Sequence, residues 1–408
     1  MQKIRRRREE YWKNSPYEHN QPNSMQVIGE RNTKGEIKMK QGRTLQALGK
    51  ELDRQRNARQ DFIADTRSIM MESDPGASHL RIEVNGMPQE FGVGEIAHQQ
   101  IATRLNIPYR YYQKMQQEQP ELLDENVNTW LHEVPERRML RVLDGRVRAF
   151  LSDRYRRLDN LELCAAVLPT ISSMRGASIE SCEVTESHLY LKVVNKRMKA
   201  EVSPGDVVQA GFVISNSEVG MGSLRVEPLV YRLVCKNGLI VKDYAKKKYH
   251  VGRQAEGSED TAYELYSDET LRQDDAAFFS KVKDIVRVAV DEAKFQMAVS
   301  KMRDAMNIPL EHDPVKEVEL LADRFLLTQA ERGDVLRQFS MGHDISRYGL
   351  MNAVTAASKI CKDYERATEL ERIGGEILSL PVPGKALEAA AFASMKNITP
   401  LRREVIVA

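Results

Sequence analysis

The residues best placed to do chemistry in this sequence are arginines, which gather in one short segment. Arg137 to Arg157, RRMLRVLDGRVRAFLSDRYRR, contains eight arginines and only two opposing carboxylates, Asp144 and Asp153. Guanidinium groups bind carboxylates and phosphates through paired hydrogen bonds. These arginines must therefore be neutralised either by carboxylates from elsewhere in the chain or by an external polyanion.

The same segment predicts a β-hairpin, because Asp144-Gly145 stands between two alternating runs and is typical of a two-residue turn. Such a turn places Val142 opposite Val147 and Leu140 opposite Ala149, a plausible core face. It also places Arg141 directly across from Arg148. Like charges in that position destabilise a sheet, so a compensating anion is expected there.

A second basic segment mixes lysines with tyrosines between Lys242 and Arg253. Lysines interleaved with aromatic rings are typical of a groove for single-stranded nucleic acid, where bases stack on rings and cations hold phosphates. A solvated basic loop at a sheet edge is an equally good interpretation. Tyr155 and Tyr244 offer further stacking faces. The predicted nucleic-acid-binding residues are Arg141, Arg146, Arg148, Arg154, Tyr155, Arg156, Arg157, Lys246, Lys247, Lys248 and Tyr249.

A helix-turn-helix is a competing hypothesis for nucleic-acid binding. The stretch from Gln100 to Pro108 has the spacing of a helix followed by a tight turn, and the next helix would carry Arg110, Gln113 and Lys114 among tyrosines. The alternative is that the apolar residues of this stretch simply pack two helices together. Duplex DNA is therefore the second candidate ligand. A protein-interaction or host-takeover factor, with arginines on protein carboxylates, is the third.

No catalytic motif is found, so we expect no enzyme, cofactor or metal site. The best candidates for a metal-dependent nuclease are Glu180, Glu183, Glu186 and Lys192, since phosphodiester cleavage needs clustered carboxylates. Their alternation instead suggests one exposed acidic strand face. The loop from Asn216 to Gly222 resembles a phosphate cradle only weakly, and a plain hairpin loop is favoured.

The composition describes a globular protein of several parts. The chain has 408 residues, a net charge of +2 and four scattered cysteines, which fits a reducing bacterial cytoplasm. It contains no apolar run long enough to span a bilayer. Because the net charge is small, a polyanion could be bound only through local patches such as Arg5 to Arg8. We therefore expect a basic, flexible arm over residues 1–43.

The elements that must position these residues predict an α+β fold. Alternating patterns favour a largely antiparallel sheet with flanking helices in a core domain over residues 44–256. Helical patterns cover Thr44 to about Met71 and Asp159 to Ile171, where Asp159 or Asn160 can cap the second helix. Residues 257–408 predict an all-helical C-terminal region with three long helices, over Thr270 to Met306, Pro314 to Phe339 and Asp344 to Ile377.

Several ordered motifs resemble a known family. Arg141 to Asn160, RVLDGRVRAFLSDRYRRLDN, is similar to the signature of the domain of unknown function 932, found in phage- and plasmid-encoded proteins. QIATRLNIPYRYYQKM before it, and YGLMNAVTAASK and LERIGGEIL near the end, extend the resemblance over roughly residues 44 to 380. The resemblance implies a mobile-element setting and no established activity. By analogy with single-strand annealing proteins, we expect a homo-oligomer that binds single-stranded DNA in annealing or recombination.

Overall fold

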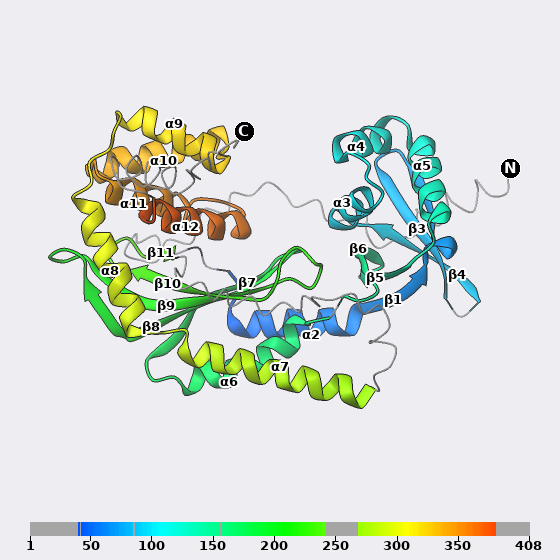
Figure 1. The fold of residues 1–408 in the computed structure, drawn as a ribbon, viewed down its shortest axis with the longest axis horizontal. Coiled ribbons are helices and arrows are strands. Elements are labelled where there is room, and N and C mark those ends of the chain that lie inside the picture. Colours follow the sequence, from blue (N-terminus) through cyan, green and yellow to red (C-terminus); the bar gives the residue numbers. More distant parts are fainter. Residues whose placement is uncertain (1–39, 41, 85, 156, 242–267, 381–408) are drawn as a thin grey trace, which may run out of the picture. The chain divides into compact units, whose positions relative to one another are not determined.

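The computed structural model describes residue 40 and residues 42–84, 86–155, 157–241 and 268–380. Within them the chain forms two β-sheets with helices packed around each, which confirms the predicted α+β class (Figure 1). The arm predicted over residues 1–43 lies almost entirely outside the described residues, as does the basic segment from Lys242 to Arg253. The domain boundaries stay predictions.

The first sheet has six strands in the order β1-β5-β6-β4-β3-β2. Neighbouring strands are antiparallel, except that β4 and β6 run parallel. Helix α2 (Leu45–Ala58) precedes the sheet, and a single turn η1 (Thr66–Ser68) joins its first two strands. The strands are β1 (Arg59–Asp65), β2 (Met70–Asp74), β3 (Ala77–Val84), β4 (Met87–Val93), β5 (Arg137–Leu143) and β6 (Arg146–Ser152).

The prediction of a helix up to about Met71 was wrong beyond Ala58, where the chain turns into β1. The apolar residues Phe62, Ile63 and Ile69 fit a helical period as well as an extended one. The segment is extended because β1 pairs with β5 along its whole length. Tertiary contacts of this kind override local propensity.

Three helices accompany the first sheet: α3 (Glu95–Arg104), α4 (Tyr109–Glu118) and α5 (Pro120–Glu133). Side chains of α5 cover the outer edge of β2. Asn128 accepts from the Met71 amide and donates to the Met71 carbonyl, and Asp124 accepts from the Ser73 amide. An open strand edge invites pairing with another chain, so α5 closes this edge.

The second sheet is an antiparallel meander in the order β11-β10-β9-β8-β7. Helix α6 (Asn160–Ser173) leads into it, close to the helix predicted from Asp159 to Ile171. The strands are β7 (Ala177–Val184), β8 (Leu189–Glu201), β9 (Val207–Asn216), β10 (Arg225–Arg232) and β11 (Asn237–Ile240).

Six further helices complete the described chain, and the three long helices predicted there are each broken in two. They are α7 (Asp268–Val288), α8 (Glu292–Met306), α9 (Pro314–Phe325), α10 (Gln329–Gly342), α11 (Arg347–Ala357) and α12 (Tyr364–Leu378). A side-chain cap marks each break, at Asp291, Thr328 and Asp363. These caps satisfy the first amides of a new helix, while the apolar period continues across the gap.

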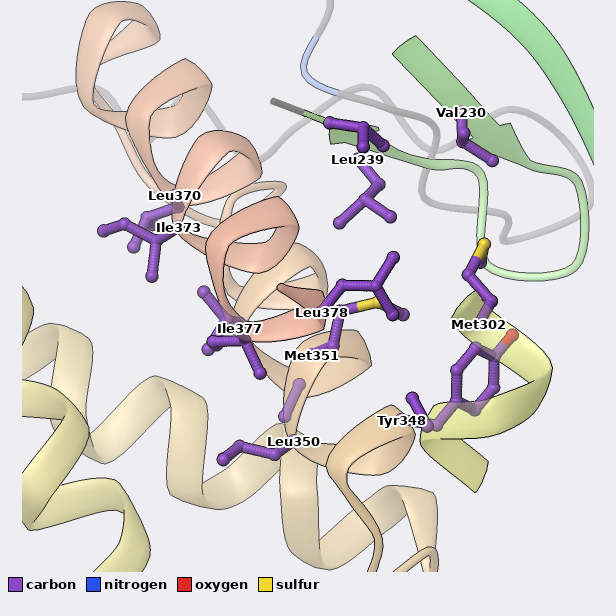
Figure 2. Packing of buried hydrophobic residues seen from close by; sticks show 14 of the residues in the cluster. Val230, Leu239, Met302, Tyr348, Leu350, Met351, Leu370, Ile373, Ile377 and Leu378 are labelled. Atoms are coloured by element: carbon purple, nitrogen blue, oxygen red, sulfur yellow. The ribbon is translucent and has the colours of Figure 1, made fainter. Parts of the chain in front are cut away.

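Three large apolar clusters form the core. One fills the space between the six-stranded sheet and α3, α4 and α5. A second joins α2, α6 and α7 to the five-stranded sheet. In the third, Leu239 and Val230 of the second sheet meet Met302, Met351 and Ile377 of the C-terminal helices (Figure 2). Each sheet therefore has its own core.

Candidate functional site

The arginine-rich hairpin forms as predicted, but with a different register beyond its turn. Asp144 and Gly145 both have positive φ, and Val142 pairs with Val147. A β-bulge then follows, so Arg141 pairs with Ala149 and Leu140 with Phe150. The prediction that Arg141 lies across from Arg148 was wrong, because the extra residue of a bulge leaves Arg148 unpaired on its strand.

Arg141 is fully buried and is neutralised from within the chain. Its guanidinium donates to Asp61 at 3.2 Å, to Asp159 at 2.7 Å and to the Glu218 carbonyl oxygen at 2.8 Å. Asp61 is also its neighbour across the strands, since β1 pairs with β5 at this position. The side chain has no exposed surface, so no phosphate can reach it in this conformation.

Arg148 is neutralised in the same way by the loop between β9 and β10. It donates to Oε2 of Glu218 at 2.6 Å, and the Asn160 amide at the start of α6 donates to Oε1 at 2.6 Å. Asn216, Ser217 and Glu218 are all buried. The loop that was weighed as a weak phosphate cradle therefore binds the hairpin instead. We call the group formed by Arg141, Arg148, Asp61, Asp159 and Glu218 the junction.

The charges of this junction hold one another in their ionised forms. Burial alone would raise the pKa of Asp159, but Arg141 and Arg59 outweigh it and leave that pKa below its usual value. Burial would likewise lower the pKa of Arg141, yet Asp159 and Asp61 raise it overall. Removing one member of a buried ion pair leaves the other charge buried without a partner, so loss of any one of these groups should destabilise the fold.

The other predicted site residues divide into accessible and inaccessible groups. Arg146 and Arg154 are exposed, and Arg157 is exposed while lying 3.5 Å from Asp61. Tyr155 is half-buried and donates its hydroxyl to the Ser217 carbonyl at 3.0 Å, which restricts stacking on its ring. Arg156, Lys246, Lys247, Lys248, Tyr244 and Tyr249 lie outside the described residues.

The nuclease candidates are not brought together. Glu183 pairs with Arg43, Glu180 lies 3.4 Å from Lys196, and Lys192 is fully buried against Glu371. In the described parts of the chain, no group of three or more His, Cys, Asp or Glu side chains could hold a metal ion. Over the same residues, every helix is too short or too polar to cross a membrane.

The predicted helix pair is present as α3 and α4, joined by Leu105 to Pro108. Asn106 takes a left-handed conformation with φ of 55°, and the Ile107 amide donates to the Ala102 carbonyl at 2.9 Å. The Tyr109 hydroxyl donates to Glu95 at 2.6 Å and ties the two helices together. The two short helices are therefore joined by a tight turn, as the sequence predicted.

The two faces of α4 differ in chemistry. Tyr112 and Met115 are buried in the core of the first sheet, and Tyr112 lies 2.8 Å from Nδ1 of His98 on α3. The outer face is exposed at Arg110, Tyr111, Lys114 and Gln117. One face of α4 therefore packs the helices together, and the other face is exposed.

The two cations of this outer face, Arg110 and Lys114, have few carboxylate partners. Within the described chain Arg110 has no hydrogen-bond or ion-pair partner, and Lys114 meets only the exposed Glu118, at 3.8 Å. Exposed ion pairs of this kind are worth little. The ring of Tyr111 is 50 % exposed between the two cations.

Comparison with protein families gives one match. A family model described as Domain of unknown function (DUF932) matches residues 149–366. The chain belongs to the DUF932 family. The match begins in β6 and ends in α12, so it includes Glu218 but not the α3–α4 pair. Its description assigns no activity. No curated protein and no solved structure matches the chain.

Sequence reasoning missed the acceptors of the hairpin arginines. Asp61, Asp159 and Glu218 come from β1, the start of α6 and the β9–β10 loop. Asp159 was read only as a helix cap, and the other two carried no local signal. In the sequence the hairpin is almost uniformly positive. In the folded chain, carboxylates from distant segments neutralise Arg141 and Arg148.

Proposed function

We propose that this protein binds DNA through the outer face of α4, with duplex DNA as the preferred form. The observation that carries the proposal is the exposed set Arg110, Tyr111, Lys114 and Gln117 on the second helix of a tight helix pair. In helix-turn-helix proteins the second helix enters the major groove, and residues near its N-terminus contact base edges. Arg110 and Tyr111 lie in the first turn of α4, and Lys114 lies one turn further along the same helix.

The chemistry of this face suits both parts of a nucleic acid. Arginine and lysine neutralise phosphates or donate to guanine, while glutamine pairs with adenine. The buried face of α4 fixes the helix on the sheet through Tyr112 and Met115. The exposed side chains are therefore presented from a rigid support, which reduces the entropy lost on binding.

Fewer of the arginines predicted to bind single-stranded DNA are accessible than the sequence suggested. Arg146, Arg154 and Arg157 are exposed near the hairpin, whereas Arg141 is buried and Arg148 pairs with Glu218. Binding of single-stranded DNA by these three arginines is the competing outcome of the experiment below. A homo-oligomer, a phage or plasmid setting and a role in annealing stay predictions.

The test is a titration of the full-length chain with labelled duplex DNA, single-stranded DNA and RNA over a range of salt concentrations. We expect tightest binding to duplex, with log affinity falling linearly against log salt. Arg110→Ala with Lys114→Ala should weaken duplex binding about 10- to 100-fold and reduce the salt slope by about two.

Two controls separate the surfaces. Lys316→Ala with Arg337→Ala removes one lysine and one arginine from exposed positions on α9 and α10 and should leave DNA binding unchanged. Arg146→Ala with Arg154→Ala tests the hairpin surface. Equal affinity of the α4 variant and the unmodified protein, or no binding at low salt, would contradict the proposal. Preference for single strands, lost in the hairpin variant, would favour the competing hypothesis.

A further inference from the structure

A cleft of about 360 Å³ lies between the second sheet and α12, and neither α4 nor the arginine hairpin contributes a residue to its lining. One wall is a row of side chains across three strands, because Ser215 of β9 pairs with Tyr190 of β8 and with Arg225 of β10. Glu365, Glu369 and Arg372 line the cleft from α12. His188 and Met221 line it from the connecting segments.

Most charges in this cleft are already paired. Arg372 donates to Glu227 at 2.8 Å, Arg366 to Glu331 at 2.6 Å, and His188 lies 3.0 Å from Glu365. Asp363 caps α12 through the Arg366 amide at 2.6 Å. These groups hold the walls in place.

Arg225 and Ser215 are different. Across the described residues, neither the guanidinium of Arg225 nor the hydroxyl of Ser215 has a hydrogen-bond partner, although Ser215 is only 2 % exposed. The Nε of Arg225 is shielded from solvent as well. Buried donors are almost always satisfied in native proteins, so the buried Nε of Arg225, with a serine hydroxyl beside it that also contacts no acceptor among the described residues, indicates an absent acceptor.

An oxyanion is the acceptor that this pair suits. The guanidinium of an arginine matches the two oxygens of a carboxylate or phosphate, and a neighbouring hydroxyl adds a third donor. Because Arg225 and Ser215 are direct neighbours across the strands, one small group can contact both.

The remaining charges decide between a carboxylate and a phosphate. Three arginines and three carboxylates line the cleft, and Arg366 and Arg372 are bound to further carboxylates, Glu331 and Glu227. A dianion would meet excess negative charge. A monoanion that also carries a cationic group would instead place that group near Glu365 and Glu369, whose side chains are 38 % and 45 % exposed.

We infer that this cleft binds a small zwitterion of the amino-acid class, with its carboxylate on Arg225 and Ser215 and its ammonium group toward Glu365 and Glu369. The cleft volume accommodates such a molecule, since ligand sites in proteins have volumes of about 300–1,000 Å³. This site is independent of DNA binding by α4.

The test is isothermal titration calorimetry of the full-length protein with each standard amino acid, and with acetate and inorganic phosphate as simple anions. We expect at least one amino acid to bind. Arg225→Gln should weaken that binding about 10- to 100-fold, because a charged hydrogen-bonded pair is lost. Ser215→Ala should weaken it by a smaller factor and tests the site without changing a charge.

Arg175→Gln is the matched control, because Arg175 is an exposed arginine outside the cleft, and it should bind as the unmodified protein does. Three results would overturn the inference. One is that no amino acid binds. Another is that both Arg225→Gln and Ser215→Ala retain full affinity. The third is that acetate or phosphate binds as tightly as the best amino acid, which would leave an anion site without zwitterion recognition.

Discussion

Arg141 joins three distant segments through one guanidinium, and its partners are two carboxylates and a backbone carbonyl. A buried ion pair contributes little net stability compared with an apolar replacement of both partners. Loss of one partner is costly because the other charge stays buried. The residue is therefore more important for the integrity of the junction than for any surface property.

Arg141→Met should lower the free energy of unfolding by about 3–5 kcal/mol, because Asp61 and Asp159 lose their main cation. Urea unfolding measures the change. Arg146→Met on the same hairpin is the matched control, since Arg146 is exposed, and it should change stability by less than about 0.5 kcal/mol. Equal stabilities of the two variants would show that Arg141 is not a structural cation.

His98 gives the fold a sensitivity to acid. Burial lowers the pKa of His98 from its usual value of 6.5 to about 4, and its ring lies between Tyr112 and Gln116. A depressed histidine pKa means that the unfolded chain takes up a proton first as the pH falls. Stability should therefore be lost between about pH 6.5 and pH 4.

The expected loss between about pH 7 and pH 5 is about 2 kcal/mol from this group alone. His98→Gln removes the titration, so its unfolding free energy should depend less on pH over that window. Urea unfolding of both proteins at the two pH values gives the comparison, and the histidine resonance followed by NMR gives the pKa directly. A His98 pKa near 6.5 in the folded protein would refute the prediction.

Helix α12 packs on β11 through Gly374 and Gly375, which lie against Leu239 and Ile240. A Cβ built on Gly375 would lie 1.9 Å from the Ile240 carbonyl oxygen, a distance that no side chain can tolerate. The helix and strand therefore approach each other closely only because this position has no side chain.

Gly375→Ala should destabilise the protein by about 1–3 kcal/mol or more, because backbone atoms must move apart. Gly333→Ala in α10 is the opposite case, with nothing within 4 Å of its Cβ, and should stabilise by about 0.5–1 kcal/mol through helix propensity. Thermal unfolding of both variants measures whether each substitution lowers or raises the stability. The same sign for both would contradict the packing argument.

At the level of elements, the sequence predicted local structure well and long-range structure less well. The hairpin at Asp144-Gly145, helix α6 and the α3–α4 pair were found because turns, caps and periodicity are local signals. The bulge beside Arg141 and the strand β1 were missed because both depend on partners far along the chain. The three long C-terminal helices were predicted wrongly because Asp291, Thr328 and Asp363 each cap the start of a new helix where the prediction continued a single one.

The candidate sites show the same division. The exposed cations of α4 could be located from the sequence, since a helix pair leaves one face outward. The cleft at Ser215 and Arg225 could not, because its walls meet only when β8, β9, β10 and α12 assemble. Nothing in the alternation of β10 marks Arg225 as unpaired.

At the scale of the whole described chain, Glu218 connects the two sheets. It lies in the β9–β10 loop of the second sheet and binds Arg148 of the first, while the start of α6 donates to its other oxygen. The large cores of the two sheets are separate clusters. Cooperative unfolding therefore depends on the Glu218 junction and on the small apolar cluster beside it, in which Val219 packs on Met139, Ala149 and Leu151.

Glu218→Gln should lower stability by about 1–3 kcal/mol, because Arg148 loses its charged acceptor. Hydrogen exchange should show faster exchange of the β5 and β6 amides, while those of α12 keep their protection. Asp153→Asn is a control at a carboxylate outside the junction. Uniform acceleration across both sheets would indicate global destabilisation instead of a local uncoupling.

The strand order β1-β5-β6-β4-β3-β2 also has a consequence for synthesis on the ribosome. β1 leaves the exit tunnel early but must wait for β5, so the first sheet cannot be completed strand by strand as the chain grows. Closing such a distant contact has an entropic cost that slows folding. Even after β5 and β6 emerge, Arg148 lacks its carboxylate acceptor until Glu218 has been made. The nascent N-terminal half therefore holds an unsatisfied arginine until the second sheet begins to form.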